Sequence, residues 1–460
     1  MNTWKKMLVL FLALAMMVVA AACSRGNSAT KETPGGAGGD AAVSDTVKVW
    51  TYPVHQAYED ELKQLIPEFM KQHPNIKVEF EVLSWAEGPK KFDVALNAGN
   101  PPDIYYGGLS GAYVNTGMVV PLDGYLTQEI KDDYEPGILE FGQIQGKQYM
   151  LPLTSGQWEW GGNKRILEEA GIDWKSIQQN GWSWTEFTEL AKKMTKKLPD
   201  NSMQYGVVTD GTSLDFSQLI TKNAGLVDLV DESGKFIWND DRILDSLNFV
   251  DSLMKDGIMP KETGALTPQQ RTQMFYDGKA AIISKAIPYY DTMIANRNKD
   301  IDAGKANGEK IEFILLPVPH HDKHPAKTYT TSEGYMMFQQ KNGKDEQHLK
   351  NVFLVLDFLT GAQGGNSSNE LCLPFTRKSQ AKAFEDKGKA TQHNWDAAVN
   401  FSQNPAPSVE NKVGLDVSSK MKQFREQVQK PAFQALFAGE KTPQQIAEEF
   451  KAKGEQMFGG

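Results

Sequence analysis

The chain has 460 residues, and its 49 Lys and Arg against 58 Asp and Glu give a net charge of −9 at neutral pH. This acidic balance disfavours polyanionic partners, so it excludes nucleic-acid binding and a basic membrane-surface role. The length exceeds what one hydrophobic core usually holds, and we therefore expect two lobes.

The first residues have the pattern of an export signal. Residues 1–22 combine a basic start, an apolar stretch and small residues before Cys23, and cleavage there would leave a thiol for a diacylglycerol anchor. Ala20 departs from the Leu, Val or Ile that lipoprotein signals prefer at this position, and an ordinary secretory signal is the alternative. With Cys23 lipidated, Cys372 would have no partner for an intramolecular disulfide, and we interpret it as a small buried hydrophobe.

Residues 23–44 are rich in glycine and nearly lack large apolar side chains. Such a segment cannot bury enough surface to order itself, and a flexible linker of this length spans roughly 25 Å. We therefore expect a protein tethered through its lipid anchor to the extracellular face of a bacterial cell membrane.

Strand and helix patterns alternate after the linker. Residues 46–52 alternate apolar and polar side chains, and apolar residues then recur at helical spacing within 58–72. A second strand is predicted at 76–82, followed by a helix that ends at Gly99, where glycine can take the left-handed closing conformation. The chain is extended again at 101–106. Strands that alternate with helices of this length predict parallel β-α-β units and an α/β fold.

Several short blocks follow this opening in a fixed order. They are residues 99–104, 149–153, 163–172, 182–187 and 275–282. Their order resembles that of the extracellular solute-binding proteins of ABC importers, in family 1, the branch with the maltose-binding and other sugar-binding lipoproteins. Gly161 and Gly162 depart from the pattern, because many relatives carry aromatic residues before the asparagine that follows.

The resemblance implies an α/β fold of the type II periplasmic-binding-protein class, with two lobes, a hinge and a ligand cleft between the lobes. Proline-bearing extended segments fit inter-lobe connections, so we place the crossings near Pro152, near Pro317 to Pro319 and near Pro374. The predicted limits are 45–153 with 319–372 for lobe one, and 154–318 with 373–460 for lobe two.

A sugar-binding cleft needs aromatic faces for the apolar side of each ring and fixed polar groups for the hydroxyls. Trp158 and Trp160 lie two residues apart after the first crossing, so an extended segment would turn both to one side. They form the strongest predicted binding element, with a core strand face as the alternative. Ser155 and Gln157 lie beside them and could hydrogen-bond sugar hydroxyls.

Further candidates follow predicted strands, where loops line the ligand sites of doubly wound sheets, or lie in polar stretches. They are Tyr52, Glu59, Tyr105, Tyr106, Tyr289, Tyr290, Glu333 and Trp395. Glu333 could equally be a solvated acid in a turn. Ser183 or Thr185 is expected to cap a helix, and Asp103 to accept backbone hydrogen bonds in its own turn.

Motifs for catalysis are missing from the sequence, which has neither a His-Glu-x-x-His helix nor a phosphate loop. His320, His321 and His324 could bind a divalent ion, but prolines on both sides leave no pre-formed geometry, so we expect no metal and no other cofactor.

The expected protein is a monomeric receptor, not an enzyme, that carries a carbohydrate, an oligosaccharide above all, to an ABC permease. Two alternatives stay open. The same fold could bind a peptide or another small solute, or two carboxylates across the cleft could make a secreted glycosidase.

Overall fold

The structure, a computed structural model, describes residues 45–343, 345–384, 390–406, 408–410 and 412–459. The predicted export signal, Cys23 and the predicted linker lie outside the described residues. Within the described ranges, none of the helices combines the length and the apolar character needed to span a bilayer.

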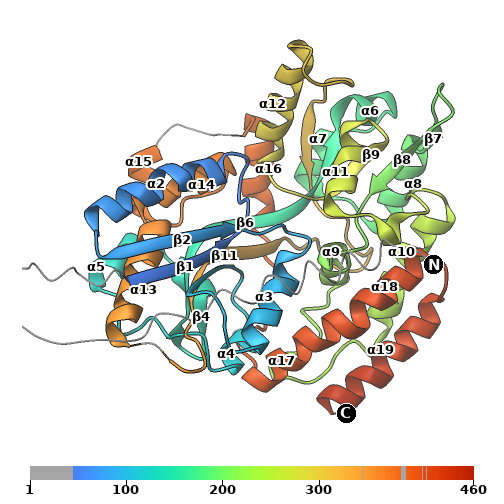
Figure 1. The fold of residues 1–460 in the computed structure, drawn as a ribbon. Coiled ribbons are helices and arrows are strands. Elements are labelled where there is room, and N and C mark those ends of the chain that lie inside the picture. Colours follow the sequence, from blue (N-terminus) through green and yellow to red (C-terminus); the bar gives the residue numbers. More distant parts are fainter. Residues whose placement is uncertain (1–44, 344, 385–389, 407, 411, 460) are drawn as a thin grey trace, which may run out of the picture. The chain divides into compact units, whose positions relative to one another are not determined.

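Eleven strands and a larger number of helices make up the described chain (Figure 1). The strands are β1 (Asp45–Thr51), β2 (Ile76–Val82), β3 (Ile104–Gly107), β4 (Gln143–Ile144), β5 (Lys147–Gln148), β6 (Met150–Asn163), β7 (Lys196–Lys197), β8 (Met203–Val208), β9 (Ala280–Ala286), β10 (Phe313–Leu316) and β11 (Tyr329–Met337). The α-helices are α2 (Tyr58–Gln72), α3 (Gly88–Asn97), α4 (Gly111–Asn115), α5 (Gln128–Asp133), α6 (Lys164–Glu169), α7 (Trp174–Asn180), α8 (Trp184–Met194), α9 (Asp215–Asn223), α10 (Asp241–Lys255), α11 (Pro268–Tyr276), α12 (Tyr290–Asp302), α13 (Glu346–Thr360), α14 (Gly365–Glu370), α15 (Lys378–Phe384), α16 (Gln392–Phe401), α17 (Leu415–Phe424), α18 (Lys430–Phe437) and α19 (Pro443–Phe458). Short helical turns are η1 (Ile138–Gly142), η2 (Thr263–Ala265), η3 (Ala362–Gly364) and the π-helical η4 (Arg425–Gln429).

The opening of the fold is the predicted β-α-β arrangement. Strand β1 pairs in parallel with β2 on one side and with β3 on the other. Helices α2 and α3 are the crossovers, and the residue after the cap of α3, Gly99, has a φ of +75°. The predicted parallel units and the glycine stop are therefore confirmed. Ser183 caps α8 in a full capping box, as predicted. Asp103 accepts a hydrogen bond from the Lys48 amide of β1, and the predicted bonds within its own turn stay a prediction.

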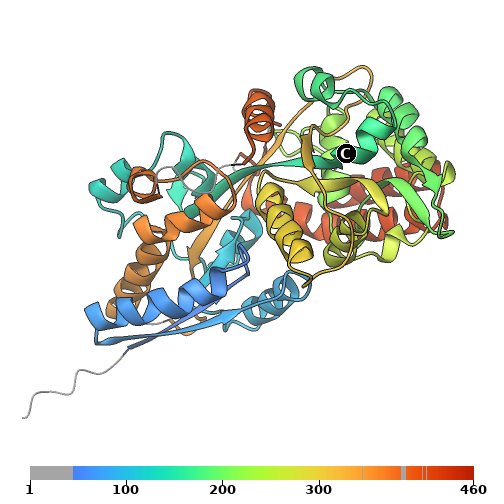
Figure 2. The same cartoon turned by 90° about the horizontal axis from the view of Figure 1, so that it is seen from above.

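One strand is shared by the two halves of the large sheet, whose order is β2-β1-β3-β11-β6-β9-β8-β7. We call β2, β1, β3 and β11 the first half, and β9, β8, β7 and β10 the second. Residues 150–158 of β6 pair with β11, and residues 159–163 pair with β9 and β10. Figures 1 and 2 show β6 running from one half into the other.

The predicted crossing near Pro152 falls inside β6, and the strand that leads back to the first half is β11, after the predicted crossing at Pro317 to Pro319. The limits of the two lobes stay a prediction.

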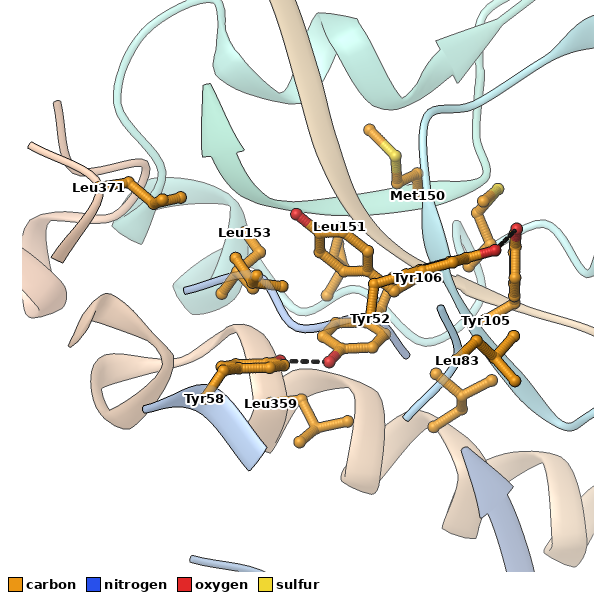
Figure 3. Close-up of a cluster of buried hydrophobic side chains, with 14 of the residues drawn as sticks. Tyr52, Tyr58, Leu83, Tyr105, Tyr106, Met150, Leu151, Leu153, Leu359 and Leu371 are labelled. Atoms are coloured by element: carbon orange, nitrogen blue, oxygen red, sulfur yellow. Dashed lines mark hydrogen bonds between the residues drawn. The ribbon is translucent and has the colours of Figure 1, made fainter. Parts of the chain in front are cut away.

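Two hydrophobic clusters fill the interior. The first packs around tyrosines of the first half, where Figure 3 shows the Tyr52 hydroxyl bonded to that of Tyr105 at 2.8 Å. The second packs around Trp160 and the helices of the second half. Successive side chains of β10 point into different clusters, because Phe313 belongs to the first cluster and Ile314 to the second. The sheet of the second half is therefore buried on both faces.

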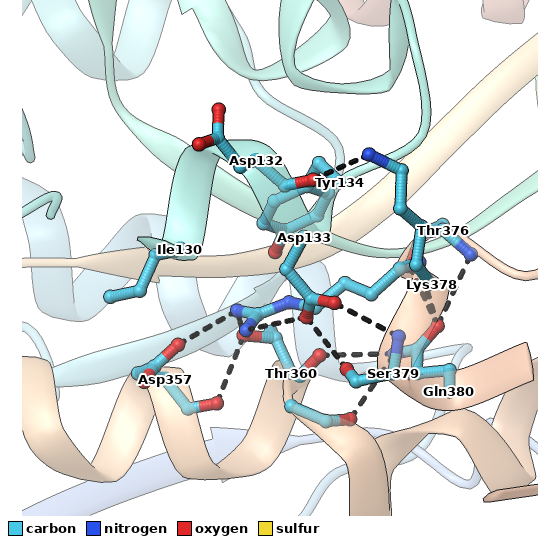
Figure 4. Close-up of polar contacts among 12 residues, drawn as sticks. Ile130, Asp132, Asp133, Tyr134, Asp357, Thr360, Thr376, Lys378, Ser379 and Gln380 are labelled. Atoms are coloured by element: carbon cyan, nitrogen blue, oxygen red, sulfur yellow. Dashed lines mark hydrogen bonds and ion pairs between the residues drawn. The ribbon is translucent and has the colours of Figure 1, made fainter. Parts of the chain in front are cut away.

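A polar network fixes the chain just after Pro374 (Figure 4). The buried Arg377 donates hydrogen bonds to Asp357 at 2.9 Å and to Thr360 at 2.7 Å, and Ser379 donates to Asp133. Because Asp133 lies on α5 while Asp357 and Thr360 lie on α13, the network holds the start of α15 to both helices.

Candidate ligand-binding site

A cavity of about 620 Å³ lies where the two halves of the sheet meet. Its aromatic lining consists of Trp85, Tyr106, Trp158, Tyr276, Tyr289 and Tyr290. Charged and polar side chains stand between these rings, among them Asp215, Gln269, Arg271, Lys285, Thr331 and Glu333. An apolar lining with a few directed polar groups is the usual composition of a small-molecule site.

The middle of β6 forms one wall. Because side chains alternate along a strand, Thr154, Gly156 and Trp158 line the cavity, whereas Ser155 and Gln157 do not. The Trp158 indole is fixed by a hydrogen bond from its Nε1 to the Thr331 hydroxyl of β11, at 2.7 Å. It therefore offers an aromatic face of defined orientation.

The neighbouring Trp160 has a different environment. It is fully buried, with the ring of Phe187 from α8 at 5.2 Å and that of Phe216 from α9 at 6.0 Å. Two helices of the second half thus cover this indole. The structure does not bring Trp160 to the cavity beside Trp158.

The first half contributes a stack of aromatic rings. Trp85, which is 40% exposed, lies on the Tyr52 ring with centroids 4.2 Å apart and an angle of 15° between the planes. The Tyr52 hydroxyl meets that of Tyr105, and Tyr105 stacks on Phe92. Burial raises the pKa of Tyr52 to about 12, so its hydroxyl stays neutral. Tyr52 and Tyr105 therefore support the lining from behind.

Lys285 reaches the cavity through an irregularity in β9. Between the pairs Glu159↔Ala286 and Gly161↔Ile283, β9 contains one residue more than β6. Lys285, at this bulge, has a φ of +54°. Bulges redirect side chains in this way. The Lys285 ammonium lies 4.3 Å from the centre of the Trp158 ring and is hydrogen-bonded to Asp215.

Asp215, Arg271 and Lys285 of the cavity lining are in ion pairs. Arg271 forms a buried ion pair with Asp210 at 2.7 Å, and Lys285 bonds to Asp215. Burial would raise the pKa of Asp215, but the charges of Lys285 and Arg271 outweigh burial and lower it. Burial also raises the pKa of Glu333, with Lys285 acting in the opposite direction. The Tyr106 hydroxyl donates a hydrogen bond to Glu333 at 3.2 Å.

Of the predicted site residues, the structure brings Tyr106, Trp158, Tyr289, Tyr290 and Glu333 together around the cavity. The other candidates lie elsewhere. Glu59 is on the exposed face of α2, where it pairs with Lys63 at 3.0 Å. Trp395 is half-buried on α16 and is not part of the cavity lining.

Sequence reasoning missed Trp85, Asp215, Arg271, Tyr276 and Lys285. One signal was available, because Lys285 is a single charge within the apolar run of β9. The others lie in helices or loops whose approach to β6 depends on the tertiary fold.

The described residues contain no group of three or more His, Cys, Asp or Glu side chains arranged to hold a metal ion. Of the histidines in the 320–324 segment, His321 lies 3.3 Å from Asp245, and its ring packs against the edge of Trp184. This segment therefore packs against the start of α8.

Comparison with known proteins identifies the family. The family model described as bacterial extracellular solute-binding protein matches residues 52–366. A binding protein of Brucella abortus is 23% identical over 304 residues, 66% of this chain and 68% of that protein. The diacetylchitobiose binding protein of Streptomyces coelicolor is 29% identical over 170 residues, 36% of this chain and 39% of that protein.

Solved structures confirm the predicted fold class. The maltose/maltodextrin-binding domain of Bdellovibrio bacteriovorus, solved with maltotriose, has a TM-score of 0.68 at 20% identity, covering 89% of this chain and 99% of that one. The sheet topology, the matched length and the family model agree, and the chain belongs to the bacterial extracellular solute-binding protein family.

Proposed function

We propose that this protein is the carbohydrate receptor of an ABC importer, which binds an oligosaccharide in the 620 Å³ cavity and presents it to a membrane permease. The observation that carries the proposal is the lining itself. Aromatic faces from separate elements, Trp85 after β2 and Trp158 on β6, stand among polar groups held in fixed directions. Sugar rings need both, since their C–H faces pack on indoles while their hydroxyls need partners.

The charge arrangement favours a neutral ligand. Asp215 is paired with Lys285 and Arg271 with Asp210, and burial raises the pKa of Glu333 and so disfavours its charged form, which leaves little free charge to attract an ionic solute. A buried polar group without a partner costs about 1 to 3 kcal/mol. A ligand rich in hydroxyls can hydrogen-bond the polar side chains of Thr154, Thr331 and Glu333 in the lining, whereas an apolar one cannot.

Relatives support the choice of ligand class. The Streptomyces relative is a diacetylchitobiose binding protein, and the Bdellovibrio structure holds maltotriose. The proposal also includes a lipid anchor at Cys23, a monomeric body of two lobes that closes on its ligand, and no catalytic step. Closure would follow because a ligand that contacts both halves of the sheet favours the state in which both are near.

Calorimetric titration of the purified protein with mono- and oligosaccharides, peptides and amino acids tests the proposal. We expect saturable binding of one glycan class only. Trp158→Ala should weaken it by about 2 kcal/mol, or roughly 30-fold, because buried tryptophans dominate binding energies. Trp395→Ala is the matched control and should bind like the wild type, since Trp395 lies outside the cavity.

Three results would contradict the proposal. If peptides or amino acids bound and no sugar did, the proposed ligand class would be wrong. Equal losses of sugar affinity in Trp158→Ala and Trp395→Ala would show that the binding site is not in the cavity. Release of shorter sugars during incubation would instead revive the glycosidase alternative.

A further inference from the structure

A second cavity, of about 380 Å³, adjoins the first. The two share the side chains of Val54, Tyr276, Tyr289 and Met293 in their linings. Beyond these, the second cavity is lined by the segment after β1, with His55 and Gln56, and by α12. Both cavities are therefore formed between the same two halves of the sheet, on either side of one shared wall.

The shared wall is held in place by a contact between the two halves. The backbone amide of Gln56, after β1, donates a hydrogen bond to the Tyr289 hydroxyl at 3.0 Å. Arg297 of α12 donates to the Tyr276 carbonyl at 2.8 Å and to the Glu309 carbonyl at 2.7 Å. Because its guanidinium is already bonded to backbone carbonyls, Arg297 is a structural part of the cavity wall and not a free cation.

His55 lies behind the lining of the second cavity. Its side chain has none of its surface exposed, and its Nδ1 has no hydrogen-bond partner. The other ring nitrogen, Nε2, lies 3.3 Å from the Glu61 carboxylate. A buried ring nitrogen without a partner is unfavourable, but this ring lies behind the lining, so the cavity is bordered here by the chain of residues 53–56.

We propose that the bound carbohydrate continues past Tyr289 and Met293 into the second cavity, so that the protein prefers oligosaccharides long enough to occupy both. This inference rests on the proposed function. One cavity alone suits a small ligand, while the two together approach the upper end of the roughly 300 to 1,000 Å³ found for such sites. The outer part of the chain would meet the segment 53–56 and, at the exposed rim, Asn296 of α12.

The test compares affinity with chain length. Two probe series are titrated into the purified protein by calorimetry, malto-oligosaccharides and chitin oligosaccharides, each from two to six units. We expect the longest members of the series that binds to exceed the disaccharide by tenfold or more. Asn296→Trp, which fills the second cavity from its rim, should reduce the affinity for long chains to that for the disaccharide.

A control variant separates the second cavity from the first. Lys299→Trp places the same side chain on an exposed position of α12 outside both linings and should leave every affinity unchanged.

The outcomes distinguish this inference from the proposed function. Two results would refute binding in the second cavity but leave the proposed function intact. They are equal affinity for short and long chains in the wild type, and equal losses of affinity for both in Asn296→Trp. Absence of binding by either series would count against carbohydrate capture itself and remove the basis of the inference.

Discussion

Glu159 is a buried carboxyl group whose ionisation should set the pH dependence of stability. It lies on β6 where the strand changes partner from β11 to β9, with 1% of its surface exposed. Its Oε2 accepts a hydrogen bond from the Val318 amide at 3.1 Å, while its Oε1 has no partner. Burial raises the pKa to about 8 from an ordinary value of 4.5, although Thr328 and Val318 act in the opposite direction.

The magnitude and the sign follow from this shift. At 1.36 kcal/mol for each pH unit, ionised Glu159 lowers the free energy of unfolding by about 5 kcal/mol. Between pH 4.5 and 8 the folded state keeps a proton that the unfolded state releases, so stability falls as the pH rises. The loss is about 3 kcal/mol at pH 7 and is complete above pH 8. Glu159→Gln keeps the size of the side chain and removes the titration.

Urea denaturation followed by tryptophan fluorescence, repeated from pH 5 to 9, measures the effect. The stability of the wild type relative to Glu159→Gln should fall by several kcal/mol across this range. Glu68→Gln, an exposed position on α2, controls for a change of net charge and should run parallel to the wild type. If the Glu159→Gln curve also ran parallel to the wild type, the carboxyl would not be buried in its neutral form and the reasoning would fail.

Two further predictions concern packing and charge in the second half. A Cβ at Gly161 would overlap the Phe313 ring, so Gly161→Ala should lower the free energy of unfolding by about 1 to 3 kcal/mol in denaturant titrations, and Phe313→Leu in the same chain should recover part of it. Arg271→Leu leaves Asp210 buried without its partner and should cost about 3 to 5 kcal/mol. Replacing Asp210 by Leu as well should restore most of that stability, and a double variant no more stable than Arg271→Leu would show that the pair is not the cause.

Local patterns in the sequence were sufficient for many elements. The helix at 58–72 and the strand at 76–82 have the predicted limits, because apolar spacing and turn residues act within a few positions. Gly161, before Asn163, has a tertiary reason instead, since it leaves room for the Phe313 ring of the distant strand β10.

Which residues line the cavity could not be predicted from local sequence patterns. Trp158 and Trp160 have the same spacing and chemistry, yet helices α8 and α9 cover only the second. Trp85 lines the cavity because Tyr52, more than 30 positions earlier, supports its ring. Lys285 enters through a bulge that depends on pairing with β6. These placements depend on contacts between distant segments, which a single sequence does not reveal.

The two pairing irregularities along β6 have a mechanical consequence. One lies beside Gly334 of β11 and the other beside Lys285 of β9, and they bracket the residues of β6 that line the cavity. Elsewhere the strand is bonded along its length, and bulges are where a paired strand bends most readily. Flexure of the sheet is then concentrated at the two ends of the segment that lines the cavity. Stiffness at residues such as Gly334, which is outside the lining, would act as a second determinant of affinity beside the chemistry of the pocket.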